Sequence, residues 1–205
     1  MHSLTVTDLA KRFGSRKVFS DISFDLNTGD TLAIVGPNGS GKTTLVMTLL
    51  RGFYPTRGSI TFSEDNTALD EDELRSQTAL VAPYLNLYDR LSAEENIVFF
   101  ATVSGTAITG KQINRMLERV GLEGRGPDAV GSYSSGMKQR LKYAVALLLD
   151  PAFLFLDEPT SNLDESGKAI VFNIIEEFRN SKIIIIATNE PEEQRLASTV
   201  CRVNG

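Results

Sequence analysis

A glycine-rich run between residues 36 and 44 is the stretch of this chain best suited to binding phosphate. It fits the pattern G-x-x-x-x-G-K-T, in which backbone N–H groups curl around phosphate oxygens at the start of a helix. Its members are Gly36, Pro37, Asn38, Gly39, Ser40, Gly41, Lys42, Thr43 and Thr44. The Lys42 ammonium would reach the outer phosphates and the Thr43 hydroxyl would bind Mg²⁺. The run predicts a site for a nucleoside triphosphate and its metal ion.

Two neighbouring carboxylates follow an apolar run later in the chain. Residues 154–156 (Leu-Phe-Leu) lead directly into Asp157 and Glu158. Open α/β sheets bind ligands at the carboxyl ends of their strands. Phosphoryl transfer needs positioning and charge compensation, so one carboxylate at the metal and one at the attacking water form a minimal set. Acids can also mark the exposed end of a strand, but the phosphate-binding run favours the functional interpretation.

A third run has the features of a helix N-terminus, where phosphate also binds well. It comprises the small residues Ser134, Ser135 and Gly136 followed by Met137, and either serine could cap the helix. Taken alone, such a run is more often a simple helix cap.

Together these runs resemble the ATP-binding cassette (ABC) ATPases, over essentially the whole chain from Leu4 to Val203. The phosphate-binding run alone would also fit kinases, GTPases and helicases. The residues that separate this family from those are the signature-like run 133–140 and, after it, the segment 154–164 that contains Asp-Glu-Pro-Thr. The resemblance implies an α/β fold: a P-loop NTPase core of the ABC type, an N-terminal antiparallel β sub-sheet and an inserted all-helical subdomain.

The resemblance also implies roles for the acidic and signature-like residues. Asp157 would hold Mg²⁺, directly or through water, and Glu158 would polarise the attacking water. Residues 134–137 would close over the γ-phosphate bound by a second copy of the chain, so that each ATP lies between two head-to-tail subunits. The family usually has glycine at its second signature position, where this chain has Ser135.

Three further residues are implied by their positions in the family pattern. Asn162 and Asp164 lie in the loop that crosses the dimer, and Asp164 also fits a helix cap before Glu165. Phe13, which we place before the first strands, matches the aromatic residue on which adenine stacks, although an isolated phenylalanine is more often a core residue.

The chain departs from the family at two places that concern hydrolysis. Where the family has a histidine that contacts the γ-phosphate, this chain has Asn189, and its one histidine is His2. Where the family has a glutamine that couples Mg²⁺ and water to the membrane partner, Tyr84 or Asn86 takes the place. These departures predict either slow ATP hydrolysis or replacements that leave the rate of hydrolysis unaffected.

Hydrophobic periodicity and turn residues predict the elements that carry these residues. We expect strands over 4–9, 22–26, 31–35, 60–62, 153–156, 183–187 and 199–203, and helices over 44–50, 92–100, 109–120, 136–149 and 170–178, with a short helix starting at Pro191. Ser92 with Glu95, and Thr109 with Gln112, form capping boxes. The whole chain, 1–205, is then one domain, with a nucleotide-binding core over 1–87 and 141–205 and a helical subdomain over 88–140.

The composition limits the class of protein. With 26 acidic and 21 basic residues the net charge is −5, which argues against nucleic acid as a partner. One cysteine is compatible with a reducing cytoplasm. We see no secretory signal and no apolar run near the roughly 18 residues of a membrane span. We therefore expect a cytoplasmic protein that lies on the inner face of the cell membrane only through a separate transmembrane permease.

The expected function is that of the ATP-binding and ATP-hydrolysing subunit of an ABC transporter, with ATP and Mg²⁺ bound, paired with a second copy of itself and energising transport through the permease. The short chain also resembles, more weakly, the small ATPases attributed to haem export in cytochrome c maturation. One alternative is a slow or inactive nucleotide-gated binding module. Another is a soluble ABC ATPase that does not transport, but such proteins carry two cassettes or a long coiled coil.

Overall fold

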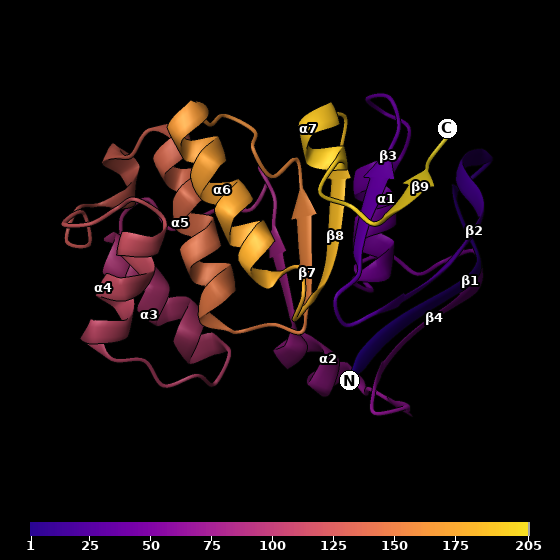
Figure 1. Ribbon diagram of the computed structural model, residues 1–205, viewed down its shortest axis with the longest axis horizontal. Coiled ribbons are helices and arrows are strands. Elements are labelled where there is room, and N and C mark those ends of the chain that lie inside the picture. Colours follow the sequence, from indigo (N-terminus) through magenta and orange to yellow (C-terminus); the bar gives the residue numbers. More distant parts are fainter. Residues whose placement is uncertain (205) are drawn as a thin grey trace.

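A computed structural model describes residues 1–204, which form two β-sheets with helices packed around them (Figure 1). The strands are β1 His2–Phe13, β2 Arg16–Asn27, β3 Thr31–Val35, β4 Arg57–Glu64, β5 Thr67–Ala68, β6 Thr78–Val81, β7 Phe153–Asp157, β8 Ile183–Thr188 and β9 Thr199–Arg202. The α-helices are α1 Lys42–Leu49, α2 Glu71–Gln77, α3 Ala93–Val103, α4 Gly110–Arg119, α5 Ser135–Leu148, α6 Glu165–Phe178 and α7 Pro191–Gln194.

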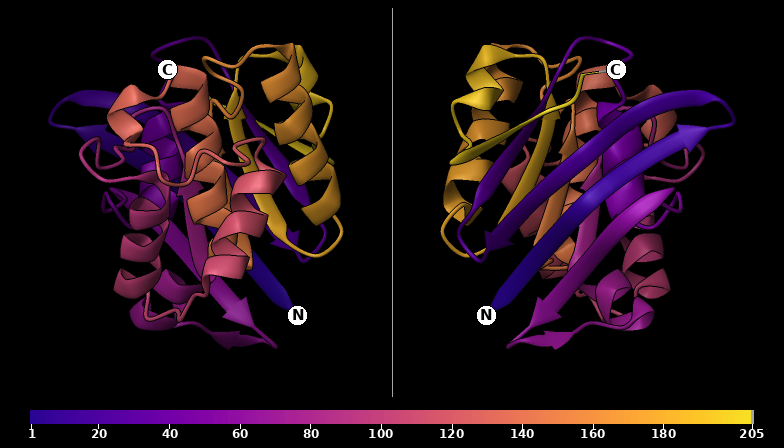
Figure 2. Two further views of the ribbon diagram at one scale, coloured as in Figure 1. Left: turned by 90° about the vertical axis from the view of Figure 1, so that its left-hand side faces the viewer. Right: turned by 90° about the vertical axis from the view of Figure 1, so that its right-hand side faces the viewer.

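The two sheets differ in topology and in burial. Strands in the order β2-β1-β4-β5 form the antiparallel sheet, and strands in the order β6-β7-β8-β3-β9 form the parallel sheet. Figure 2 shows the long strands of the antiparallel sheet curving across one side of the molecule. Every residue of β3, β7 and β8 is buried, as expected for parallel strands that are covered on both faces. The predicted α/β class with an antiparallel sub-sheet is confirmed.

Alternating side chains of the parallel sheet supply two hydrophobic cores. On one face, Phe153, Phe155 and Ile185 pack with residues of the antiparallel sheet and of α1. On the other face, Leu154 and Ile186 pack with residues of α3 to α6. The parallel sheet therefore lies between the antiparallel sheet and the helical layer, and the carboxyl ends of β3, β7 and β8 meet at one edge (Figure 1).

Helices α3, α4 and α5 begin at capping residues that the sequence predicts. Both predicted capping boxes form, at Ser92 and at Thr109. At α5 the Ser134 hydroxyl accepts a 3.2 Å hydrogen bond from the Met137 amide, so Ser134 is the cap and Ser135 is the first residue of the helix. The α5 helix is continuous across residue 140, where the sequence places the boundary between the helical subdomain and the nucleotide-binding core.

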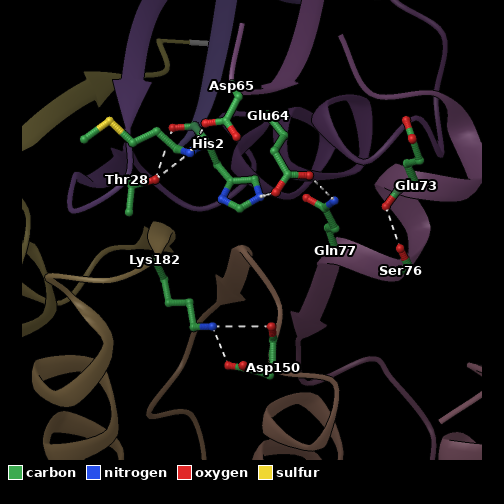
Figure 3. A network of polar contacts seen from close by, with 10 residues as sticks. His2, Thr28, Glu64, Asp65, Glu73, Ser76, Gln77, Asp150 and Lys182 are labelled. Carbon is green, nitrogen blue, oxygen red and sulfur yellow. Dashed lines mark hydrogen bonds and ion pairs between the residues drawn. The ribbon is translucent and has the colours of Figure 1, made fainter. Parts of the chain in front are cut away.

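The structure also contains elements that the sequence interpretation omitted, among them α2, β5 and β6. A capping box at Asp70 and Glu73 starts α2, and the four-residue β6 pairs with β7 at the sheet edge. Polar contacts far from the phosphate-binding run fix this region: Glu64 Oε1 lies 3.3 Å from His2 Nε2, and Gln77 Nε2 donates a 3.1 Å hydrogen bond to Glu64 Oε2 (Figure 3). These contacts tie β1, β4 and α2 together.

Candidate nucleotide site

The phosphate-binding run lies between β3 and α1, and two of its glycines are required by close packing. Gly41 has a φ of 108°, and a Cβ atom there would collide with Val18 Cγ1. A Cβ atom at Gly36 would collide with the Val203 carbonyl oxygen and approach the Ser40 hydroxyl to 2.7 Å. Only glycine fits both positions, and the loop so formed leads into the N-terminus of α1, where an anion is favoured.

Lys42 is 6% exposed and is fully hydrogen-bonded. Its Nζ donates to the Gly36 carbonyl (2.8 Å), the Pro37 carbonyl (3.3 Å) and Asn189 Oδ1 (2.8 Å). The Asn189 Nδ2 in turn donates to Asn38 Oδ1. The structure therefore brings Asn189, at the end of β8, directly against the phosphate-binding loop, where the sequence places a γ-phosphate contact.

Asp157, at the end of β7, is the buried carboxylate of the site. It is 2% exposed, and neither of its oxygens accepts a well-formed hydrogen bond from residues 1–204. Burial raises the pKa of Asp157, while the nearby Thr43 and Tyr84 hydroxyl groups and the Lys42 charge lower it and Glu158 raises it further. A buried acid with free oxygens beside a threonine hydroxyl is the donor set that Mg²⁺ prefers, so these residues fit the ion.

No group of three or more acidic, histidine or cysteine side chains in the described chain could hold a metal by itself. Asp157 and Thr43 would therefore share Mg²⁺ with phosphate oxygens of the nucleotide, as Mg²⁺ commonly does.

Glu158 follows Asp157 and is exposed, with a backbone that few residues adopt. Its φ is 48°, in the left-handed region, and its amide donates a 2.9 Å hydrogen bond to the Ala187 carbonyl. This turn directs the two consecutive acids to different surroundings: Asp157 is enclosed, whereas Glu158 lines two open clefts. A water-polarising carboxylate needs such access.

Phe13 is the last residue of β1, not a residue before the first strands as the sequence interpretation placed it. Its ring is 47% exposed, meets the Phe53 ring edge-on at 5.5 Å and lies 4.7 Å from the Lys11 ammonium. It opens onto a cleft of about 430 Å³ that also contains the phosphate-binding residues. Lining residues are Phe13, Arg16, Val18, Asn38, Gly39, Gly41, Lys42, Thr43, Thr44 and Glu158. The aromatic face is thus available to a base whose phosphates sit at Lys42.

Arg16 and Val18 are lining residues that sequence reasoning missed. They enter the cleft because β2 pairs with β1 so that Arg16 lies opposite Phe13. Their position depends on the pairing register of the β1–β2 hairpin, and no local sequence motif indicates it.

A second cleft of about 390 Å³ adjoins the first and shares Asn38 and Glu158 with it. Thr160, Asn162, Asn189 and Glu193 also line it. Glu193 is a further residue that the sequence interpretation missed, because a glutamate in a short helix carries no local signal of burial.

Residues 134–137 are not among those that line either cleft within the described chain. Ser135 instead borders a separate groove together with Asn162. A Cβ atom on Gly136 would lie 3.0 Å from the Asn162 carbonyl oxygen, so the signature-like run and the 162–164 loop pack closely. Within the described residues, the signature-like run therefore lies outside the two clefts that the phosphate-binding residues line.

Asp164 caps α6. Its Oδ1 accepts a 2.8 Å hydrogen bond from the Gly167 amide, and this bond, with the Ser166 hydroxyl, lowers the pKa of Asp164. The predicted helix cap is confirmed, and it leaves the preceding Asn162 exposed with a φ of 63°.

The two candidates for the missing coupling glutamine lie in different places. Burial raises the pKa of Tyr84 and the nearby Asp157 carboxylate raises it further, whereas Asn86 lines the groove with Ser135. The Lys142 ammonium of α5 fixes this segment through the carbonyls of Ala82 (3.0 Å) and Pro83 (2.9 Å). Of the two candidates, Tyr84 is thus the one close to Asp157.

Known proteins are similar to this chain in sequence and in fold. The ABC transporter family profile matches residues 19–161. An uncharacterised ABC transporter ATP-binding protein of Bacillus subtilis, YxlF, is 34% identical over 98% of this chain and 68% of its own length. The bacitracin transport ATP-binding protein BcrA of Bacillus licheniformis is 34% identical over 96% of this chain, which spans 65% of that relative.

Solved structures agree with these relatives. The ATP-binding subunit of an ABC transporter superposes with a TM-score of 0.85 at 26% identity, over 98% of this chain and 85% of that one. A dimeric ATP-binding cassette in a post-hydrolysis state with ADP and phosphate gives 0.83 at 23% identity, over 98% of this chain and 94% of that one, and shows the fold alone. With this family match, these relatives and the paired acids at the end of β7, the chain belongs to the ABC transporter ATP-binding family.

Proposed function

We propose that this chain binds and hydrolyses ATP to energise transport through a separate membrane protein. The observation that carries the proposal is the convergence of Lys42, Asp157 and Glu158 at the carboxyl ends of β3 and β7. The family membership established above supports ATPase chemistry.

Each residue has a separable role in this mechanism. The loop amides and Lys42 hold the phosphates, and the Phe13 ring stacks on the base. Asp157 and Thr43 hold Mg²⁺, which supplies charge neutralisation at the phosphate oxygens when it is bound. Glu158 orients the attacking water and takes up its proton, and Asn189 contacts the γ-phosphate with a neutral amide.

The active unit is a dimer in which each nucleotide also contacts residues 134–137 of the other copy. The position of these residues outside the clefts of their own chain supports this arrangement. The dimeric cassette described above is a precedent from a protein of the same fold.

The membrane partner docks on the part of the groove that Asn86 and Tyr88 border. An exposed aromatic group lies at its edge: Tyr88 is 48% exposed and its ring centroid is 4.7 Å from that of Phe99. Within residues 1–204 no helix has the length and apolar character needed to cross a bilayer. In this proposal the transport path lies in the membrane partner, and the chain sits on the inner membrane face through it. Haem as the transported substrate remains a prediction from the sequence.

The second candidate is a nucleotide-gated module with little turnover, favoured by Asn189 and Tyr84 in the places of the family's histidine and glutamine. Release of phosphate from Mg-ATP by the purified chain, with and without the membrane partner, separates the two. Turnover that disappears in Glu158→Gln supports the ATPase. ATP binding with no turnover in either condition contradicts the ATPase and supports the module.

A further inference from the structure

Glu193 is the most deeply buried carboxylate near the site and has no part in the mechanism above. It lies in α7, just beyond Asn189, and is 1% exposed. Burial raises the pKa of Glu193, and the hydroxyls of Thr160 and Thr188 partly offset this. An acid in such surroundings is costly unless its contacts compensate.

Its hydrogen bonds join two loops that are distant in sequence. Glu193 Oε1 accepts a 3.1 Å bond from the Thr160 amide and a second bond from the Thr160 hydroxyl. Thr160 belongs to the turn that begins at Glu158, whereas Glu193 follows Asn189. One carboxylate oxygen thus holds the turn of the water-polarising acid to the segment that carries the γ-phosphate contact.

The turn that Glu193 holds is strained. Glu158 has a φ of 48°, a conformation that persists only where the surroundings over-determine it. Three sets of contacts do so. The Ala187 carbonyl accepts from the Glu158 amide, the Pro159 carbonyl accepts from the buried Tyr143 hydroxyl at 3.0 Å, and Glu193 accepts from Thr160.

We infer that Glu193 is a positioning residue for ATP hydrolysis: through Thr160 it keeps Glu158 aimed at the cleft and keeps Asn189 in register with it. This inference rests on the proposed ATPase function. It concerns the geometry of the hydrolytic step, because neither Glu193 nor Thr160 lines the cleft that Phe13 and Lys42 share. Loss of the contact should therefore reduce kcat and leave ATP affinity unchanged.

The test compares Glu193→Ala with Glu193→Gln and Thr160→Val, measuring kcat and the Kd for ATP in the full chain. Misplacement of catalytic groups by about 1 Å costs up to roughly 100-fold in rate, so Glu193→Ala should lower kcat about 10- to 100-fold with Kd changed less than about twofold. Glu193→Gln keeps an acceptor for Thr160 and should restore most of the rate. Thr160→Val loses the hydroxyl but keeps the amide donor and should fall between.

A destabilised control separates positioning from general loosening. Leu74→Ala opens the core at α2, at the other end of the sheets, and should lower the Tm without lowering kcat. The inference is overturned if Glu193→Ala keeps its kcat, if Glu193→Gln is as slow as Glu193→Ala, or if kcat and ATP affinity fall together. A wild-type chain that binds ATP but never hydrolyses it overturns the proposed function, and this inference with it.

Discussion

The Lys42 ammonium donates a 2.8 Å hydrogen bond to Asn189 Oδ1 and so joins residues that are 147 positions apart. Asn189 also donates to Asn38, so its amide is oriented by the phosphate-binding loop on both sides. A neutral amide can orient a γ-phosphate, but it cannot carry positive charge toward the oxygens that gain negative charge.

Replacing Asn189 should change hydrolysis and leave binding nearly constant. Removing one preorganised donor costs about 10²–10³ in kcat in well-studied enzymes, and an amide is a weaker contact, so Asn189→Ala should cost roughly tenfold to a hundredfold. Asn189→His should raise kcat. Steady-state kinetics with ATP binding in parallel checks both. Unchanged turnover in both variants means that Asn189 does not touch the γ-phosphate.

Lys42→Ala should remove most ATP binding. Charge-assisted hydrogen bonds contribute about 1.5–3 kcal/mol each, which corresponds to at least roughly a tenfold loss of affinity per contact. Isothermal titration calorimetry with Mg-ATP measures this loss. Lys111→Ala, an exposed lysine of α4 outside both clefts, is the control and should bind as the wild type does.

Phe13→Ala should weaken ATP by about 1–3 kcal/mol, the usual contribution of an aromatic ring stacked on a base. A triphosphate without a base should bind both proteins equally, because the phosphate loop is intact. Tyr54→Ala serves as control: this ring is 84% exposed and is not among the residues that line the cleft within the described chain. Equal affinity of Phe13→Ala and wild type for ATP would place the base elsewhere.

Glu158→Gln should bind ATP, fail to cleave it and accumulate as a dimer. The substitution keeps the size of the side chain but removes the base that takes up the proton of the water. Size-exclusion chromatography with ATP and Mg²⁺ should show the dimer, and adding Ser134→Arg should abolish it by blocking the opposite phosphate. A Glu158→Gln protein that stays monomeric at high concentration with ATP contradicts the shared site.

Asp157→Asn should stabilise the nucleotide-free protein while abolishing its response to Mg²⁺. The folded-state pKa of Asp157 is raised, so the folded protein holds this proton more tightly than the unfolded chain does. Stability is therefore lost as the pH rises from about 4, the unfolded value, through the raised pKa, and the loss persists at neutral pH. Asp157→Asn removes the buried negative charge, and we expect this to stabilise the nucleotide-free protein by about 1–3 kcal/mol.

Urea unfolding at several pH values measures this difference, which should vanish below the unfolded pKa and grow toward pH 7. Asp164 is a control of opposite sign. Its pKa is lowered by the helix cap, so its contribution is present above the unfolded pKa and lost on acidification. Asp164→Ala should therefore be less stable than wild type at neutral pH. If the wild-type protein is more stable than Asp157→Asn at pH 7 without nucleotide, the buried Asp157 carboxylate does not destabilise the protein and the prediction is wrong.

The sequence predicts the parts of this fold whose signals are local. The phosphate loop, the capping residues Ser92 and Asp164 and the fully apolar strand β8 each depend on neighbouring residues alone, and the structure contains them. The α2 helix has an equally local signal, the capping box of Asp70 and Glu73, but the predicted elements do not include it. The short β6 has no distinct period, and its pairing with β7 defines it.

The site was only partly predictable for the same reason. Arg16 lies at the cleft because of the register in which β2 pairs with β1. Glu193 is buried and accepts a hydrogen bond from Thr160 because two loops pack together. Neither placement produces a local pattern in the amino-acid sequence. The sequence alone also leaves open whether Tyr84 or Asn86 replaces the coupling glutamine. The answer depends on the path of the backbone after β6, which the Lys142 ammonium fixes through the Ala82 and Pro83 carbonyls.

The α5 helix lies near both nucleotides of the proposed dimer, so changes in it bear on mixed dimers of altered and normal copies. Its first turn would serve the nucleotide of the opposite subunit, while its Tyr143 hydroxyl supports Pro159 beside the nucleotide of its own. A lesion in α5 is therefore expected to impair both nucleotides of a dimer, even when the other copy is normal. Cells that make altered and normal copies in equal amounts would keep full activity only in the about one quarter of dimers that random pairing leaves unaltered. Such alleles of α5 should behave as dominant.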